Sequence, residues 1–221
     1  MYNPFMSKKQ TLIFVTAMIL FTVMGIGAGY YASIHSRSDQ NPGIQGLLWP
    51  NPKPLTPFTT IDENGGSFDL NRLHGKWSFL FFGYTHCPDV CPLTLAVFKQ
   101  VLQQLGKDKN PDKVQMVFVT VDPARDTPER LKEYVNYFNR DIIGVGGSDA
   151  QIKSLTSQLG IVYLAGEKSA SGDYYVDHSA SVFLIDPMGR LVSIFSPPHA
   201  ADTIVARYRR IRDFIEARQI N

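Results

Sequence analysis

Apolar and polar positions follow two distinct rhythms along the chain. Residues 77–84 (WSFLFFGY) and 114–121 (VQMVFVTV) are nearly continuous apolar runs, typical of strands that are covered on both faces of a sheet. Between these runs, apolar residues recur at helical spacing and a glycine follows them: Leu95, Phe98, Leu102, Leu105 and Gly106. The pattern therefore predicts a strand, a helix and a second strand, in that order.

Further elements are predicted on either side of this unit. The turn Asn64-Gly65-Gly66 separates two short strand-like segments and indicates a hairpin. Thr127 and Pro128 are typical of a helix start, as the N-cap and the first helical residue. The pattern also predicts helices over 127–139, 149–159 and 201–217, and strands over 142–145, 179–186 and 190–195. This order of elements is that of a thioredoxin-like fold, so the predicted fold class is α/β.

The N-terminal segment predicts a single transmembrane helix. Residues 11–31 carry no charged side chain, and about 20 apolar residues suffice to cross a bilayer. Lys8 and Lys9 precede the segment, so residues 1–10 should stay in the cytoplasm and the bulk of the chain should lie outside. A cleaved signal peptide is the alternative. The length of the apolar segment and the lack of a small-residue cleavage site favour an uncleaved anchor.

Beyond the expected anchor, the chain divides into a linker and a domain. Residues 32–57 become rich in proline and glycine, which indicates an extended linker, and residues 58–221 suit one domain of ordinary size. The chain has 22 Lys and Arg against 20 Asp and Glu, and two of the lysines precede the anchor. The exported part is therefore formally neutral, which argues against nucleic acid as a partner.

The two cysteines of the chain stand close together in GYTHCPDVC, residues 83–91. This stretch falls at the first strand–helix junction, where α/β sheets place their chemistry. Pro88 and Asp89 suit the first turn of a helix, so Cys87 should lie at the helix N-terminus, with Cys91 one turn further on the same face. The positive end of the helix dipole should favour a thiolate there.

Three kinds of site are open to such a pair. A structural disulfide would close a very short loop and stabilise the fold weakly. A redox couple of the thioredoxin type usually has two residues between its cysteines, whereas three separate Cys87 from Cys91. The wider spacing leaves room for a metal ion, which would need further ligands.

Histidine is the natural source of a further ligand. The chain has five histidines: His35, His74, His86, His178 and His199. His178 stands before a predicted strand, in a loop that approaches the first helix in a thioredoxin-like fold. His86 adjoins Cys87 but should point elsewhere, and the other three are expected on the surface or near the anchor. Asp122 and Asp177 are either ordinary turn residues or neighbours of the site.

Three sequence blocks together resemble the Sco/SenC family of copper-binding proteins. These blocks are GYTHCPDVCP, VTVDPARDTPERLKEYV and DYYVDHSASVFLIDPMGRLV. The resemblance covers nearly the whole exported domain and implies a membrane-anchored protein with a thioredoxin-like fold. It also implies that Cys87, Cys91 and His178 bind copper, both Cu(I) and Cu(II). The donor set itself agrees with copper, although it leaves zinc open.

The resemblance further implies a role in assembly of cytochrome c oxidase. A metallochaperone would bring copper to the binuclear centre of oxidase subunit II, with no catalytic residue of its own. The alternative is a thiol-disulfide oxidoreductase that reduces the cysteines of that subunit through a redox disulfide between Cys87 and Cys91. Either role predicts a periplasmic thiol-disulfide reductant, because oxidised cysteines cannot bind copper, and the first also predicts a copper donor. A peroxidase would need an arginine beside the cysteines, and the sequence identifies none.

Overall fold

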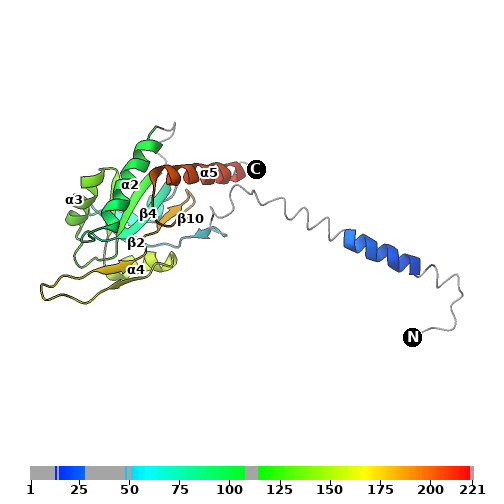
Figure 1. Ribbon diagram of the computed structural model, residues 1–221, viewed down its shortest axis with the longest axis horizontal. Helices are drawn as coiled ribbons and strands as arrows, with labels where there is room; N and C mark the ends of the chain where they lie inside the picture. Colours follow the sequence, from blue (N-terminus) through cyan, green and yellow to red (C-terminus); the bar gives the residue numbers. More distant parts are fainter. Residues whose placement is uncertain (1–12, 14, 28–47, 49–50, 108–113, 220–221) are drawn as a thin grey trace. The chain divides into compact units, whose positions relative to one another are not determined.

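The computed structural model describes residues 13, 15–27, 48, 51–107 and 114–219 (Figure 1). Residues 13 and 15–27 are helical and exposed, and they fall within the predicted anchor, which otherwise lies outside the described residues. Among the described residues, no helix combines the length and the apolar character that a membrane span requires. The anchor therefore stays a prediction. The remaining described residues belong to a compact unit that extends from Gly46 to Asn221.

An eight-stranded mixed sheet forms the centre of this unit. Its strand order is β1-β10-β9-β4-β5-β6-β2-β3. The strands are β1 (Lys53–Pro54), β2 (Thr59–Asp62), β3 (Ser67–Asp69), β4 (Trp77–Gly83), β5 (Val114–Thr120), β6 (Ile142–Gly146), β9 (Val182–Ile185) and β10 (Arg190–Phe195). β4, β5 and β6 are parallel, and all other neighbouring pairs are antiparallel. Gly83 and Thr120 are register partners, so β4 and β5 end at the same edge of the sheet.

Helices cover both faces of the sheet. The helical elements are η1 (Leu70–Arg72), α2 (Val90–Leu105), α3 (Pro128–Phe138), α4 (Asp149–Gln158) and α5 (Ala201–Gln219). Side chains of β4 alternate between two buried clusters, because successive residues of a strand point to opposite faces. Phe79 and Phe81 pack with α2, α3 and α5, whereas Leu80 and Phe82 pack with α4 and the N-terminal hairpin. The chain therefore has a core on each face of β4.

Most of the predicted elements are confirmed. The two apolar runs are the central strands β4 and β5, and the side chain of Thr127 caps α3 by accepting from the Arg130 N–H. The predicted strand over 179–186 is shorter, and a separate hairpin precedes it, formed by β7 (Tyr163–Ala165) and β8 (Val176–His178). Lys53–Pro54, inside the predicted linker, is a strand that pairs with β10. The α/β fold class agrees with the prediction.

Candidate metal centre

The loop between β4 and α2 carries both cysteines. The sequence pattern predicts that Pro88 and Asp89 form the first helical turn, but α2 begins only at Val90 because the backbone of Asp89 is not helical. Cys87 therefore precedes the helix, while Cys91 lies in its first turn. Cys91 is fully buried and Cys87 is half-buried, so the pair has one accessible sulfur.

Gly83 leaves the space that the Cys91 sulfur fills. A Cβ atom at Gly83 would lie 2.6 Å from Cys91 Sγ and 2.9 Å from the Phe118 ring. The φ angle of Gly83 is not positive, so packing rather than backbone conformation requires glycine here. The last residue of β4 thus sets the position of one candidate ligand.

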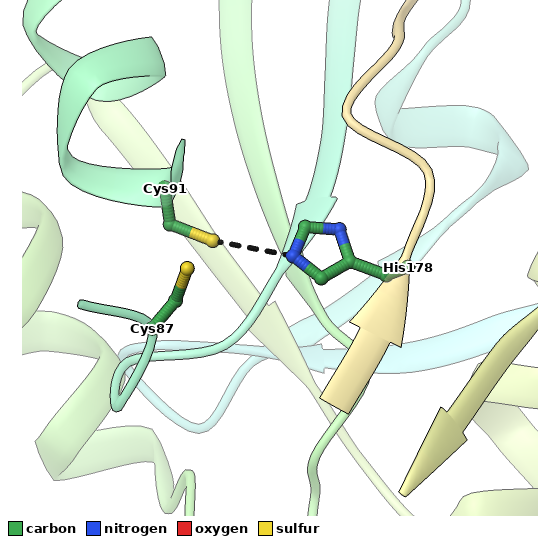
Figure 2. A group of neighbouring side chains, drawn as sticks. All are labelled: Cys87, Cys91 and His178. Carbon is green, nitrogen blue, oxygen red and sulfur yellow. Dashed lines mark hydrogen bonds between the residues drawn. The ribbon is translucent and has the colours of Figure 1, made fainter. Parts of the chain in front are cut away.

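His178, the last residue of β8, presents its ring to the cysteines (Figure 2). His178 Nδ1 lies 3.0 Å from the carbonyl oxygen of Ser179. Because a carbonyl can only accept, Nδ1 carries the proton and Nε2 keeps its lone pair. Nε2 lies 3.6 Å from Cys91 Sγ, and the rings of Tyr84 and Phe81 contact the imidazole edge to face at 5.8 and 6.1 Å. The imidazole is therefore oriented as a metal ligand.

Three donor atoms converge at this point. The two Sγ atoms and a His178 ring nitrogen all lie within 4.8 Å of one another. Metal–sulfur and metal–nitrogen bonds of roughly 2.0–2.3 Å place two ligands of one ion about 4 Å apart, so small side-chain movements suffice to close the site. Within the residues described, this is the one cluster of three or more His, Cys, Asp or Glu side chains that could hold a metal ion.

The two thiols differ in acidity. A hydrogen bond with the Cys91 side chain lowers the pKa of Cys87 to about 3, against the opposing effect of burial. The same hydrogen bond to Cys87, together with burial, raises the pKa of Cys91. Cys87 therefore loses its proton first, and the remaining proton lies between the two sulfurs. The two thiols titrate as one coupled pair. A thiolate is the form that both metals and disulfides require.

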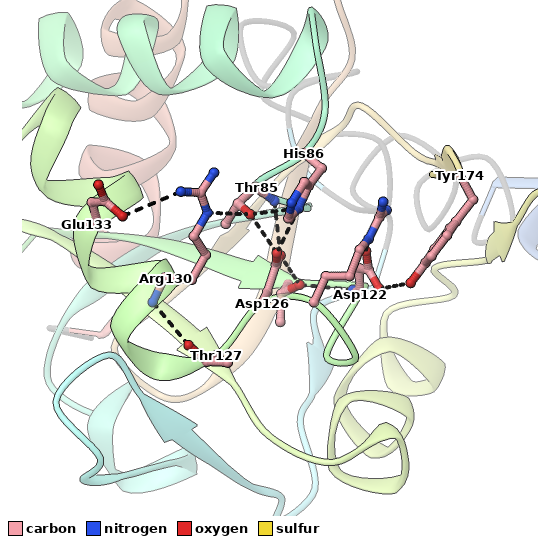
Figure 3. A network of polar contacts seen from close by, with 10 residues as sticks. Thr85, His86, Asp122, Asp126, Thr127, Arg130, Glu133 and Tyr174 are labelled. Atoms are coloured by element: carbon pink, nitrogen blue, oxygen red, sulfur yellow. Dashed lines mark hydrogen bonds and ion pairs between the residues drawn. The ribbon is translucent and has the colours of Figure 1, made fainter. Parts of the chain in front are cut away.

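A buried carboxylate braces the loop that leads to Cys87 (Figure 3). Asp126, whose side chain is fully buried, accepts hydrogen bonds from the Thr85 N–H (3.0 Å), the Thr85 hydroxyl (2.7 Å) and the Thr120 hydroxyl (2.6 Å). Arg130 Nε also donates to the Thr85 hydroxyl at 3.4 Å. The turn after β5 thus fixes the position of the cysteine loop.

The remaining candidate residues lie away from the ligand atoms. His86 Nδ1 faces Thr85 Oγ1 and Asp126 rather than the sulfurs, as expected from its place beside Cys87. His199 Nε2 donates to a backbone carbonyl at 2.7 Å, and Asp177 is exposed. Asp122 bonds to Arg125 and Tyr174. His74 packs beside Gly189, and His35 lies outside the described residues.

Sequence reasoning missed Gly83 and Asp126 as parts of this site. A glycine at the end of a buried strand is a usable signal of close approach. Asp126 gives no such signal, because its partners Thr85 and Thr120 become neighbours only in the folded chain.

Known proteins share this fold and much of this sequence. A family model described as SCO1/SenC matches residues 50–213. An SCO2-like protein of Rickettsia conorii is 33% identical over 192 residues, which are 85% of this chain and 92% of that protein.

Two solved structures that resemble this chain contain bound copper. Bradyrhizobium japonicum ScoI with copper bound has a TM-score of 0.65 and 37% identity, over 72% of this chain and 99% of that one. Arabidopsis thaliana ScoI with copper bound has a TM-score of 0.66 and 32% identity, over 73% and 98%. The residues matched by the family model, 50–213, include both cysteines and His178.

Proposed function

The chain belongs to the SCO1/SenC family, and from this premise we propose that it is a membrane-anchored copper metallochaperone with Cys87, Cys91 and His178 as its copper ligands. The convergence of three donor atoms within 4.8 Å carries the proposal. Copper-bound structures of two relatives give the metal.

The donor set fits copper in both oxidation states. Thiolates are soft ligands that favour Cu(I), and imidazole suits Cu(I) and Cu(II) alike. Two sulfurs and one nitrogen complete a three-coordinate Cu(I) site, whereas Cu(II) would add a fourth ligand such as water. The lone pair of His178 Nε2 is free for this purpose because Nδ1 donates to Ser179. Copper is cargo here: it enters and leaves through the accessible side of the site, next to half-buried Cys87.

The acceptor that we propose is the binuclear copper centre of cytochrome c oxidase subunit II. The family resemblance of the three sequence blocks supports this step. A structural neighbour, BsSco, is described as a member of the Sco family of cytochrome c oxidase assembly proteins. The chain would also need a copper donor and a periplasmic reductant that keeps both cysteines reduced.

The proposed location is the outer face of a membrane. Residues 11–31 would anchor the chain, residues 1–10 would remain in the cytoplasm, and residues 32–57 would link the anchor to the domain over 58–221. The charge-free apolar segment and the lysines before it support this arrangement. A SCO1/SenC family member from Bacillus anthracis is a lipoprotein, which is another way to hold such a domain at a membrane.

Thiol-disulfide exchange is the second candidate function, and the acidity of Cys87 favours it. The Cys87 thiolate would attack one sulfur of a partner disulfide and release the other as a thiolate. Cys91 would then attack the mixed disulfide, form the Cys87–Cys91 disulfide and release the second partner thiol. In total, the pair would give the partner two electrons and the one proton of Cys91, and the partner thiolate released in the first step would take its proton from water.

Metal titration of the full-length reduced protein tests the first proposal. We expect one tightly bound copper per chain, and loss of tight binding in His178→Ala and in the Cys87→Ser/Cys91→Ser protein. His86→Ala is the matched control and should bind as wild type, because His86 faces Asp126. Zinc as a competitor distinguishes the two metals that the donors suit. Wild-type copper affinity in His178→Ala would remove the third ligand and the proposal with it.

A further inference from the structure

A clasp of three side chains holds the segment that carries His178. The hydroxyl of Tyr174 donates to Asp122 Oδ1 at 2.7 Å. The guanidinium of Arg125 lies 3.6 Å from the centre of the Tyr174 ring and bonds through Nε to Asp122 Oδ2. Asp122 and Arg125 belong to the turn after β5, so the clasp joins this turn to the chain four residues before His178. Figure 3 shows Tyr174 reaching Asp122.

The spacing of residues connects the clasp to the candidate ligand. In an extended strand, side chains two residues apart point to the same face. Val176 and His178, the first and last residues of β8, follow this spacing, and Tyr174 lies two residues before the strand. Val176 is 5% exposed and belongs to the same buried cluster as Tyr84. Tyr174 packs against the same cluster, so its bond to Asp122 fixes the residues just before β8, one face of which carries Val176 in the core and His178 toward the cysteines.

Asp122 and Arg125, which hold Tyr174, are themselves fixed by further contacts. Asp122 is 4% exposed, and its N–H donates to the Thr120 hydroxyl at 2.9 Å. Arg125 also lies 5.7 Å from the ring centre of Tyr84, which in turn contacts the His178 ring. Arg125 therefore touches the cysteine loop and the His178 segment at once, and its charge is compensated by Asp122.

We propose that Arg125 and Tyr174 are positioning residues for the metal: they hold His178 within reach of Cys87 and Cys91 without binding the ion. The inference rests on the proposed copper site. The hairpin from Tyr163 to His178 is largely exposed and pairs in a sheet of only two strands, which is weak support by itself. The contacts of Tyr174 with Asp122 and Arg125 add the tertiary support that this hairpin does not have by itself.

A double-mutant cycle tests this role. Copper affinity of the full-length reduced protein is measured for Tyr174→Ala in the wild-type and the His178→Ala backgrounds. We expect a loss of about 10-fold to 100-fold in the first background, as for other residues that orient a metal ligand, and a change of less than about twofold in the second. Tyr175→Ala is the matched control, because Tyr175 is 70% exposed, and it should bind copper as wild type.

Two further measurements separate positioning from general destabilisation. Hydrogen exchange of the Val176 and His178 amides should accelerate in Tyr174→Ala, while the alkylation rate of Cys87 stays that of wild type. Tyr174→Phe keeps the ring on Arg125 and removes one hydrogen bond, so it should lose about fivefold in affinity. If Tyr174→Ala does not fold, the copper affinity of Tyr174→Phe tests the positioning role instead.

Each outcome has a distinct meaning. Wild-type affinity in Tyr174→Ala, or in Tyr174→Phe where the alanine variant does not fold, overturns the positioning role if His178→Ala still weakens binding. Equal losses in both backgrounds also overturn it, because Tyr174 would then not act through His178. If His178→Ala itself binds copper as wild type, the proposed ligand set fails first.

Discussion

Alanine at Gly83 should displace one proposed copper ligand, Cys91, while leaving the fold intact. The added Cβ would lie 2.6 Å from Cys91 Sγ, whereas ordinary contacts begin near 3.4 Å, so the sulfur must withdraw by 0.8 Å. The Phe118 ring, at 2.9 Å, closes the other direction and must also move. The strand itself accepts alanine, because the φ angle of Gly83 is not positive.

The magnitude follows from the tolerance of metal sites. Ligand distances in such sites hold to within about 0.2 Å, so the forced shift of the sulfur is several times larger than a metal can absorb. Overpacking of a core costs about 1–3 kcal/mol of stability. Copper binding would pull Cys91 back against the added methyl group and would have to overcome a strain of similar size. Copper affinity should therefore fall at least about tenfold, which corresponds to ~1.4 kcal/mol.

The assay compares Gly83→Ala with a matched overpacking variant. At Gly146, a Cβ would lie 2.9 Å from Leu131 Cδ1, a side chain of α3. Both variants should lower the midpoint of urea unfolding without copper, but only Gly83→Ala should lose copper affinity in a competition titration. Equal copper affinity for Gly83→Ala and wild type would refute the reasoning, because the Cys91 sulfur would then not be a fixed ligand.

Three further predictions concern the thiol pair and the contacts around it. Because its pKa is lowered to about 3, Cys87 in the copper-free protein should react with iodoacetamide at nearly equal rates at pH 6 and pH 8, whereas a free thiol would gain almost a hundredfold. Cys91→Ala should restore a steep pH dependence, and an unchanged profile would show that Cys91 is not the cause. Asp126→Asn should cost about 2–4 kcal/mol of unfolding free energy in urea, since buried donors lose a charged acceptor; a loss below 1 kcal/mol would contradict the brace. His199→Ala removes the donor to Ala180, two residues beyond His178, and should weaken copper binding severalfold, with His199→Gln restoring it; equal affinities in both variants would exclude this contact.

Local sequence signals were sufficient for the central strands and for the Thr127 cap of α3. The apolar runs that became β4 and β5 are buried at nearly every position, so their pattern is strong. The thiol pair could also be located, because it follows β4 at the edge of the sheet where β5 also ends. Recognition of His178 required the fold, since its ring meets a cysteine 87 residues earlier in the chain.

The hairpin before His178 could not be predicted from periodicity. Leu164 in β7 is 68% exposed, and few other positions of this hairpin are apolar and buried, so no alternating pattern marks it. The contacts of Asp126 were equally hidden, because Thr85 lies 41 residues away in sequence. Networks of buried polar groups depend on tertiary geometry, which a single sequence does not display.

The two edges of the large sheet limit how this molecule can meet other chains. One edge is the two-residue strand Lys53–Pro54, and the other is the three-residue strand Ser67–Asp69. Both strands are too short to offer an extended peptide much backbone to pair with, and the lysine and proline of the first further discourage aggregation through strand addition. A partner would therefore find little backbone to pair with at either edge of this sheet, so that surface shape and charge would decide recognition there.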